Sequence, residues 1–405
     1  MSIDPAADLT VQEQAHLRRA LMLAERGLYT ADPNPRVGCV IADRHGVVGE
    51  GWHVRAGEPH AEVLALRAAG DRARGANVYV TLEPCSHTGR TPPCADALIA
   101  AGVARVWCCT ADPNPKVAGS GIERLRAAGI EVAVGAFGAQ ARALNPGFFS
   151  RFERRRPYVR LKMAMSLDAR PARGGPAPVG AAPDRPVAPA NRGQVWISGE
   201  ESRADVQTWR ARSSAVLTGS GTVLCDDPKL NVRLNYGPWV RQPLRVVLDT
   251  ELRCSPRAQI FQDGGALTFA GLDAPASGAL NVERVARAQG GLDLDAVIAR
   301  LTALEINELL LECGARLAGA FLGKGLVDEM VLYVAPSLMG QDAAPLAYFG
   351  GSPPDGAPRD GERRDGERRD GVQAADTSAP ASRFEFSDVR RIGDDVRLVL
   401  TSRKN

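Results

Sequence analysis

Four side chains near the start of the sequence could together perform metal-dependent hydrolysis. His60, Cys85 and Cys94 offer one imidazole and two thiolates, a donor set that binds Zn²⁺ and leaves its fourth position for water. Glu62 lies two residues after His60, where its carboxylate could carry a proton between that water and a leaving amine. Because zinc lowers the pKa of such a water, the set predicts a hydrolytic centre with Glu62 as catalytic acid and base.

One observation and one alternative weigh against this interpretation. Eight residues separate Cys85 from Cys94, whereas nucleobase deaminases carry their two cysteines in a C-x-x-C spacing. An inactive zinc-stabilised scaffold would use similar ligands, but it needs a fourth ligand and no neighbouring acid, so Glu62 favours catalysis. The other six cysteines lie in or beside apolar runs, which is typical of buried thiols: Cys39, Cys108, Cys109, Cys225, Cys254 and Cys313.

Regular elements must bring these four residues together. Strands that alternate with helices predict a layered α/β sheet. His60 and Glu62 then begin one helix and Cys94 another, so that the N–H groups of helix N-termini favour thiolate and hydroxide. The expected helices are 9–26, 59–69, 94–101 and 121–128, and the expected strands are 37–42, 47–52, 77–82, 105–110 and 130–134.

A second α/β pattern follows the basic segment 151–157, RFERRRP, which predicts a linker between domains at 1–150 and 157–405. The proline-rich segment 171–190 is expected to be a mobile loop. The segment 352–382, with its tandem RDGER repeat, is expected to be a disordered low-complexity insertion. The expected strands are 158–165, 215–218, 244–248, 266–270, 308–312 and 329–335; the helices are 202–212, 292–303 and 315–323; a hairpin pairs 383–386 with 396–400.

Composition excludes several classes of function. The chain carries 50 Lys and Arg against 47 Asp and Glu, and residues 1–150 carry 15 of each. This balance disfavours the rival prediction, a nucleic-acid-editing deaminase with an accessory binding domain. No apolar run approaches the ~20 residues of a membrane span, and no signal-peptide pattern opens the chain, so we expect a cytoplasmic protein without a membrane partner.

The histidines divide the chain. All five lie at or before position 87: His16, His45, His53, His60 and His87. Any chemistry in the remainder must therefore proceed without an imidazole acid, base or ligand.

Longer motifs around the first four residues resemble those of the bifunctional riboflavin-biosynthesis deaminase/reductase family. The resemblance is highly specific and covers nearly all of residues 9–350. In that family the same GRTPP-containing loop separates the two thiolates, so the wide spacing of Cys85 and Cys94 supports the deaminase prediction. The motifs are NPRVG at 34–38, GEPHAE at 57–62, TLEPCSHTGRTPPC at 81–94 and DPNPKV at 112–117.

The resemblance implies a cytidine-deaminase-like three-layer α/β/α domain that binds one Zn²⁺ through His60, Cys85 and Cys94. This domain would hydrolytically deaminate 2,5-diamino-6-ribosylamino-4(3H)-pyrimidinone 5′-phosphate at the ring's 2-position, with Glu62 moving the proton. The loop residues that could shape its pocket are Asn34, His53, Ser86 and His87.

Without the family resemblance, the second half of the chain gives weaker evidence of its function. The strand at 308–312 runs through Cys313 and Gly314 into a helix, and a small-residue turn at a helix N-terminus is a ready site for a cofactor phosphate. The turn is not a GxGxxG sequence, so a Rossmann domain is not indicated.

Three motifs in this half resemble the family's reductase domain, whose α/β fold is similar to dihydrofolate reductase: KMAMSLD at 162–168, WIS at 196–198 and TGSGTVLCDDP at 218–228. The resemblance implies that NADPH reduces the ribosyl chain of the pyrimidine ribose phosphate to ribityl. The protein then supplies orientation rather than an imidazole. The resemblance also implies that the protein forms a homo-oligomer.

Site residues in this half are carried over position by position. The implied NADPH contacts are Ala164, Trp196, Thr222, Asp226, Thr250, Gly314, Ala315, Arg316, Leu317, Ala318, Gly319 and Ala320. The implied substrate contacts are Gln194, Arg210, Asp226, Leu230, Arg233 and Glu312. Arginine forks match the phosphate oxygens of such a substrate. Gln194 replaces the family's usual serine, and Cys313 replaces a common glycine.

Overall fold

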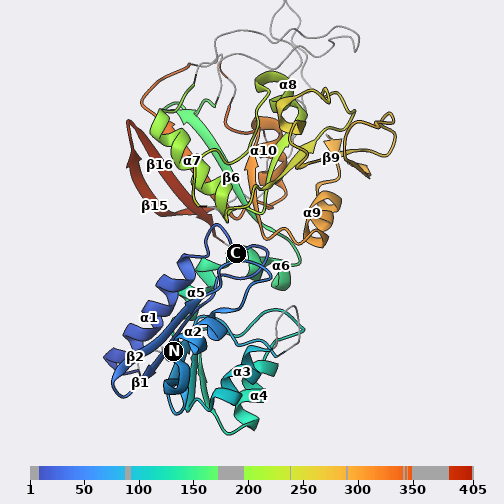
Figure 1. The fold of residues 1–405 in the computed structure, drawn as a ribbon. Helices are drawn as coiled ribbons and strands as arrows, with labels where there is room; N and C mark the ends of the chain where they lie inside the picture. The colour runs from blue at the N-terminus through green and yellow to red at the C-terminus, as the bar shows by residue number, and fades with distance from the viewer. Residues whose placement is uncertain are drawn as a thin grey trace, which may run out of the picture.

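The computed structural model describes residues 9–86, 93–171, 196–237, 239–288, 291–340, 343, 345–348 and 383–403. His87 and Gln194 lie outside the described residues, as do the segment 352–382 and the segment 171–190 apart from Pro171. The described chain forms two domains stacked end to end, with α6 at their boundary (Figure 1).

The N-terminal domain contains a five-stranded sheet of order β2-β1-β3-β4-β5, in which β1 runs antiparallel to β2 and β3 while β3, β4 and β5 are parallel. Its elements are α1 (Val11–Glu25), β1 (Gly38–Asp43), β2 (Gly46–Trp52), α2 (Ala61–Ala69), the 3-10 turn η1 (Gly70–Ala73), β3 (Asn77–Val80), α3 (Cys94–Ala101), β4 (Arg105–Cys108), α4 (Ser120–Ala127), β5 (Glu131–Val134), α5 (Gly138–Leu144) and α6 (Pro146–Glu153).

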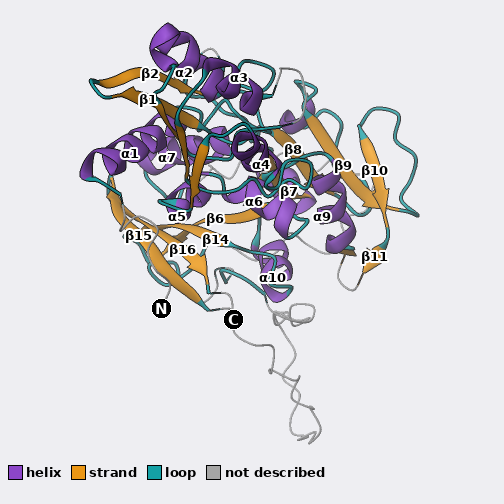
Figure 2. Ribbon diagram, turned by 90° about the horizontal axis from the view of Figure 1, so that it is seen from below, coloured by secondary structure: helices purple, strands orange, loops and turns teal. Residues whose placement is uncertain are grey.

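Helices cover both faces of this sheet (Figure 2). On β1, Cys39 and Ile41 join the apolar cluster with α2, α3 and α4, whereas Val40 joins the cluster with α1 and α5. This alternation follows from the two-residue period of a strand. A capping box starts α1, because the Thr10 hydroxyl accepts from the Glu13 N–H and the Glu13 carboxylate accepts from the Thr10 N–H.

The C-terminal domain contains a nine-stranded sheet of order β10-β9-β8-β7-β13-β6-β14-β16-β15, parallel from β10 to β14 and closed by the antiparallel β16 and β15. Its elements are β6 (Tyr158–Ser166), α7 (Glu200–Arg212), β7 (Ala215–Gly219), α8 (Ser220–Asp226), β8 (Leu244–Leu248), η2 (Gln259–Phe261), β9 (Ala266–Gly271), β10 (Val282–Val285), β11 (Arg287–Ala288), β12 (Gly291–Leu292), α9 (Leu294–Ala303), β13 (Glu308–Glu312), α10 (Ala315–Gly323), β14 (Glu329–Ala335), β15 (Phe384–Ile392) and β16 (Asp395–Ser402).

Two apolar clusters again lie on opposite faces of the sheet. Leu309 and Leu311 of β13 pack with α9 and α10, whereas Leu310 packs with α7 and α8. Because both faces are covered, the central parallel strands read as continuous apolar runs, as Leu309–Leu311 does in the sequence. This arrangement directs the carboxyl ends of β6, β7, β8 and β13 toward one edge of the sheet.

The two domains are joined by buried charge. The Glu308 carboxylate, at the start of β13, pairs with Arg36 of the N-terminal domain (2.7 Å) and with Arg160 (2.9 Å) and Arg212 (3.1 Å) of its own domain. Burial alone would raise the pKa of Glu308, but the three guanidinium groups hold it well below its usual range. Beside this cluster Gly147 of α6 approaches Asn307 so closely that a Cβ would lie 2.5 Å from its carbonyl oxygen.

The segment expected to be a linker is structured. Residues 151–153 continue α6, and Arg154 and Arg156 both pair with Asp328 of the C-terminal domain. Its basic composition reflects a partner carboxylate that lies far away in the sequence. The sequence patterns also gave no sign of α5, α6, α8 or the short strands β10, β11 and β12. Among the described residues, no helix is long and apolar enough to cross a membrane.

Replacing Glu308 by Ala should lower the free energy of unfolding by about 3–5 kcal/mol, because it leaves buried arginines without a counter-charge. Urea denaturation of the purified variant measures this. Glu131→Ala is the matched control, since Glu131 pairs with Arg105 but is 62% exposed, and its loss should cost about 0–1 kcal/mol. Equal costs for the two variants would contradict a central role for Glu308.

Candidate functional site

The three predicted metal ligands lie together. The Nδ1 atom of His60 is 3.5 Å from the Cys85 Sγ and 3.3 Å from the Cys94 Sγ, and all three donor atoms lie within 4.8 Å of one another. Zinc with bonds of about 2.0–2.3 Å in tetrahedral geometry would separate a nitrogen and a sulfur ligand by about 3.6 Å. The residues therefore fit a tetrahedral zinc ion with one position left for another ligand.

Two helix starts and one strand end position these ligands. His60 is the N-cap of α2, Cys94 is the first residue of α3, and Cys85 lies in the loop after β3. The Cys94 N–H points at the Cys85 Sγ at 3.4 Å, as expected where a helix N-terminus stabilises a thiolate. Interaction with the Cys94 and His60 side chains lowers the pKa of Cys85 below its usual range.

Close packing sets the start of α2. A Cβ on Gly51 of β2 would lie 2.3 Å from the Ala61 carbonyl oxygen, so only glycine lets the strand approach the helix this closely. Glu62, in the first turn of α2, is 3% exposed. Burial raises the pKa of Glu62 to about 7, and its side chain interacts with Cys94. The carboxyl group therefore reaches the cluster from the protein interior.

The structure brings two of the expected pocket residues to the metal ligands. His53 is 2% exposed, and its ring lies edge-on to that of His60 with centroids 5.2 Å apart. Its Nδ1 donates to the Pro59 carbonyl oxygen (3.3 Å), which leaves Nε2 to accept from the Asn34 Nδ2 (3.1 Å). Burial lowers the pKa of His53 to about 4, so the ring is neutral.

Ser86 stands beside Cys85, and its Oγ lies 2.5 Å from the Ser120 Oγ at the start of α4. It therefore faces the segment 112–122, which includes the DPNPKV motif. The remaining expected pocket residue, His87, lies outside the described residues.

Glu83 organises that segment, a role that the sequence prediction missed. Its carboxylate is 3% exposed and accepts four backbone N–H groups. The donors are Asp112 and Gly119 on Oε2 and Gly121 and Ile122 on Oε1, at 3.0 to 3.3 Å. Two features of the sequence could have indicated this role: an acid directly after a buried strand, and a helix that starts with Gly-Ser-Gly. The exposed N–H groups at such a helix start attract a carboxylate.

A second buried polar cluster lies at the carboxyl end of β13 in the C-terminal domain. Arg210 of α7 donates to both oxygens of Glu312 through its Nε (2.6 Å) and Nη2 (2.9 Å). Burial would raise the pKa of Glu312, but Arg210 and Lys162 lower it to about 2. Lys162 of β6, which the prediction did not single out, lies 3.8 Å from Glu312; burial lowers its pKa.

Two further expected substrate contacts, Leu230 and Arg233, lie in the segment between α8 and β8. Arg233 is exposed, and its backbone N–H donates to the Oε1 of Gln207 (2.9 Å), which lies on α7 together with Arg210. Leu230 is instead 4% exposed and packs in the apolar cluster with Trp209. Its side chain supports the loop rather than facing solvent.

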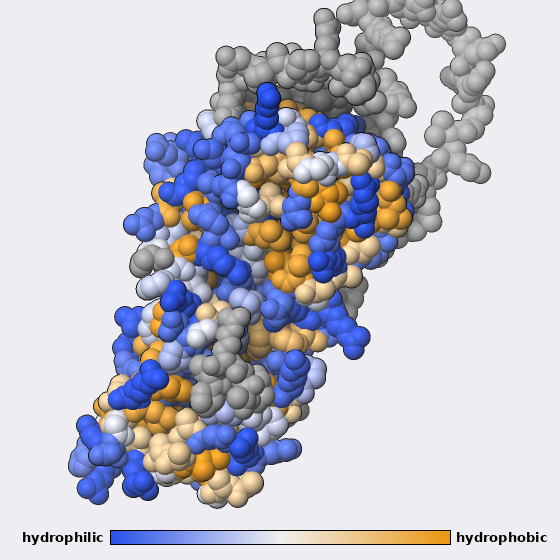
Figure 3. All heavy atoms as spheres, turned by 45° about the vertical axis from the view of Figure 1, so that its right-hand side comes forward, coloured by the Kyte–Doolittle hydropathy of each residue, from blue (hydrophilic) through white to orange (hydrophobic). Residues whose placement is uncertain are grey.

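Most of the expected cofactor contacts gather at the carboxyl edge of the parallel strands, where ligands of open α/β sheets bind. Ala164 lies near the end of β6, Thr250 follows β8, and Thr222 and Asp226 lie on α8. Gly314, the N-cap of α10, carries no side-chain cap. Figure 3 shows hydrophobic side chains gathered on the side of this domain where α8, α10 and β9 lie.

The turn into α10 is only partly open. Gly314, Arg316 and Ala320 are exposed, and Leu317 is half-buried. Ala315, Ala318 and Gly319 are buried, and a Cβ on Gly319 would lie 1.8 Å from the Tyr348 carbonyl oxygen. Trp196 is 56% exposed, and the Arg203 guanidinium of α7 lies 5.0 Å over its ring, so this contact places Trp196 against α7.

Comparison with known proteins finds two family models. Residues 10–110 match the cytidine and deoxycytidylate deaminase zinc-binding region, and residues 157–355 match the RibD C-terminal domain. These matches, together with the architecture, confirm the predicted fold classes: cytidine-deaminase-like for the first domain and dihydrofolate-reductase-like for the second.

Full-length relatives agree with both domains. The chain is 42% identical to the riboflavin biosynthesis protein RibD of Escherichia coli (strain K12), over 96% of this chain and 99% of that one. Its structure is similar to Acinetobacter baumannii RibD (form 1), with a TM-score of 0.79 at 40% identity, covering 97% and 99% of the two chains. A deaminase/reductase from Thermotoga maritima gives a TM-score of 0.76 at 28% identity, with coverage of 97% and 99%.

Changing Glu83 to Gln should loosen the segment 112–122, since the amide nitrogen would face backbone N–H donors. We expect retained zinc, a loss of about 1–3 kcal/mol of stability and a roughly tenfold loss of hydrolytic deamination. Metal analysis, thermal unfolding and ammonia release measure these. The control is Glu123→Gln on the exposed side of α4, which should behave as wild type. Unchanged deamination in Glu83→Gln would contradict the role.

Proposed function

The chain belongs to the RibD family, and on that premise we propose how its residues divide two reactions between two domains. The protein is a bifunctional enzyme of riboflavin biosynthesis, a zinc-dependent deaminase and an NADPH-dependent reductase. The alternative of a nucleic-acid-editing deaminase is not favoured. The observation that carries the proposal is the convergence of His60, Cys85 and Cys94 beside the buried Glu62.

In the first reaction, 2,5-diamino-6-ribosylamino-4(3H)-pyrimidinone 5′-phosphate exchanges its 2-amino group for the oxygen of water and releases ammonia. Zinc, when bound to His60, Cys85 and Cys94, makes water a competent nucleophile at neutral pH. Glu62 takes a proton from the attacking water and returns it to the departing amino group. Asn34 and His53 hold the pyrimidine, since their mutual hydrogen bond fixes both beside His60.

In the second reaction, NADPH bound in the C-terminal domain would supply the hydride that reduces the ribosyl carbon, and a proton would complete the opening of the sugar to ribityl. Glu312 accepts hydrogen bonds from sugar hydroxyls, with its charge kept by Arg210 and Lys162. Arg233 is exposed and is anchored through its N–H on α7, the helix that carries Arg210, and a guanidinium there suits the substrate phosphate. The product is 5-amino-6-ribitylamino-2,4-pyrimidinedione 5′-phosphate.

The residues at the carboxyl edge of the second sheet fit NADPH. The uncapped N-terminus of α10 offers backbone N–H groups to a phosphate. Gly219, at the end of β7, packs against Leu317 of α10, which brings α8 with Thr222 and Asp226 next to this turn. The hydrophobic side chains gathered on this side of the domain suit a cofactor with aromatic rings (Figure 3).

Four finer expectations complete the proposal. We assign the deaminase to residues 1–150 and the reductase to residues 157–405. We place the enzyme in the cytoplasm, and on the family resemblance we expect a homo-oligomer. His87 and Gln194 keep the pocket roles that this resemblance implies.

One coupled assay tests the whole assignment. The purified protein receives the diaminopyrimidine phosphate with and without NADPH, while ammonia and NADPH absorbance are followed. We expect ammonia in both cases and NADPH oxidation only after deamination. Consumption of neither would overturn the assignment.

Glu62→Gln should retain zinc but release ammonia about 10²–10⁴-fold more slowly, because an amide cannot carry the proton. Metal analysis and ammonia assays measure the two properties. The same variant should still reduce the deaminated pyrimidine when it is supplied directly. Deamination at the wild-type rate would refute the assigned role.

Glu312→Gln should raise the KM for the deaminated pyrimidine roughly tenfold, because it removes a charged acceptor for sugar hydroxyls. The KM for NADPH and the rate of ammonia release should stay close to wild type, which serves as the internal control. Steady-state kinetics with each substrate varied in turn decide this. An equal rise in both KM values would point to general disruption instead.

A further inference from the structure

A loop of the C-terminal domain reaches from the candidate reductase site to the other domain. We call it the bridging loop and define it as residues 232–242, of which Pro238 lies outside the described residues. Gln242 closes its base, since its side chain accepts from the Val232 N–H (2.8 Å) and donates to the Val232 carbonyl oxygen (2.9 Å). The loop therefore leaves and re-enters the domain at one point.

The base of the bridging loop is tied to the cluster around Glu312. The Arg233 N–H donates to the Gln207 Oε1 (2.9 Å), and the carbonyl oxygen of Asn231 accepts from the Arg210 Nη1 (3.2 Å). Arg210 is the same residue that pairs with Glu312. The position of Arg233 relative to this cluster thus depends on how the loop is held.

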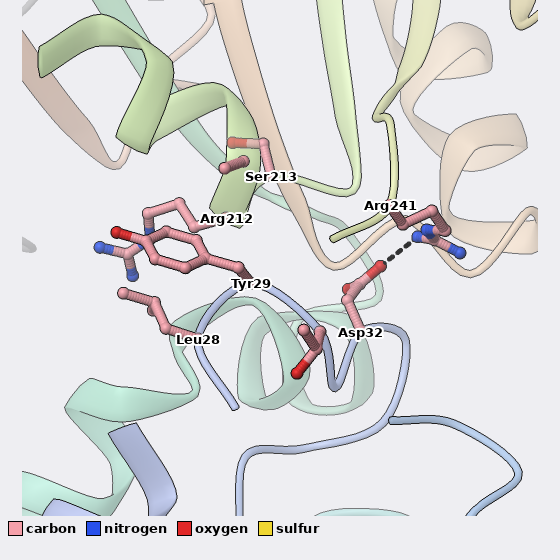
Figure 4. A pocket seen from close by; sticks show the side chains of 8 residues that line it. Leu28, Tyr29, Asp32, Arg212, Ser213 and Arg241 are labelled. Atoms are coloured by element: carbon pink, nitrogen blue, oxygen red, sulfur yellow. Dashed lines mark hydrogen bonds and ion pairs between the residues drawn. The ribbon is translucent and has the colours of Figure 1, made fainter. Parts of the chain in front are cut away.

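The bridging loop rests on the N-terminal domain through three contacts of different kinds. The Tyr236 ring packs against the Tyr29 ring with centroids 4.9 Å apart. The guanidinium of Arg55 lies 4.0 Å over the Trp239 ring. Arg241 forms an ion pair with Asp32, drawn as a dashed line in Figure 4.

The N-terminal residues that receive the loop are themselves fixed. The Asp32 Oδ1 accepts from the Ser214 Oγ (2.8 Å) and from the Asn307 Nδ2 (3.0 Å). Arg55 pairs with Glu58 at 2.8 Å, and the Thr30 hydroxyl donates to the Val54 carbonyl oxygen. A rigid surface therefore meets the exposed loop, whose internal anchors lie mainly at its base.

We propose that the N-terminal domain positions the substrate-binding loop of the reductase, with Tyr29, Asp32 and Arg55 as positioning residues for Arg233. This inference rests on the proposed reductase function of the C-terminal domain. Without the three contacts, substrate must order the loop as it binds, and that ordering weakens binding. The deaminase domain thereby contributes to the second reaction without touching its substrate.

The test compares the full-length wild type with Arg55→Ala, Trp239→Ala and the double variant. Calorimetry with the deaminated pyrimidine phosphate gives the dissociation constant, and steady-state reduction gives KM and kcat. We expect each single variant to raise the dissociation constant and KM by about fivefold, with kcat and the KM for NADPH within about twofold of wild type. The double variant should show the same dissociation constant and KM as each single variant, because Arg55→Ala and Trp239→Ala remove the same contact.

Arg142→Ala is the matched control. Arg142 lies 4.1 Å over the Phe149 ring and pairs with Glu153, so it repeats the geometry of Arg55 away from the bridging loop. It should leave binding and KM unchanged, and Arg55→Lys should restore part of the affinity because it keeps the cation.

Binding and KM at wild-type values in both single variants would overturn the inference, as would an equal loss of affinity in Arg142→Ala. A wild-type enzyme that deaminates but never oxidises NADPH would instead overturn the proposed reductase. Normal reduction with unaffected variants would remove only the positioning role.

Discussion

A buried carboxylate at the boundary of the two domains constrains much of the molecule. Glu308 receives guanidinium groups from both sides, Arg36 from the N-terminal domain and Arg160 and Arg212 from its own. A charge removed from water this completely is tolerated only when its partners hold a fixed geometry. Glu308 begins β13 and Glu312 ends it. The strand that carries the reductase cluster around Glu312 therefore also fixes the relative orientation of the two domains.

The same logic explains the loop at 32–36. Asn34 faces His53 and the metal ligands, whereas Asp32 and Arg36 on either side of it bind Ser214, Asn307 and Glu308 of the other domain. In an extended segment side chains two apart would share one side, but residues 32–34 form a turn, which lets Asn34 point away from Asp32 and Arg36. The motif NPRVG therefore serves two surfaces at once, and its arginine is a structural residue of the interface.

The sequence predicted local chemistry well and distant contacts poorly. His60, Cys85 and Cys94 could be grouped because helix starts and a strand end carry them in one pattern, and the central strands could be placed from their apolar runs. The short helix α8 and the end-to-end pair α5 and α6 lack a long periodic face, so they gave no signal. Which arginine pairs with Glu308 or Asp328 depends on tertiary packing, and no spacing in the chain encodes that choice.

Glu83 and Lys162 show where the limit lies in the sites themselves. Each sits in a segment that the prediction recognised, yet its function depends on what folds against it: four N–H groups from the segment 112–122 for Glu83, and Glu312 of a neighbouring strand for Lys162. A buried charge inside an apolar run must have a partner, because isolated burial would shift its pKa until it became neutral. The sequence thus indicates that a partner exists, and only the fold identifies it. For a chain that fuses two reactions, those unidentified partners include the contacts through which one domain shapes the other.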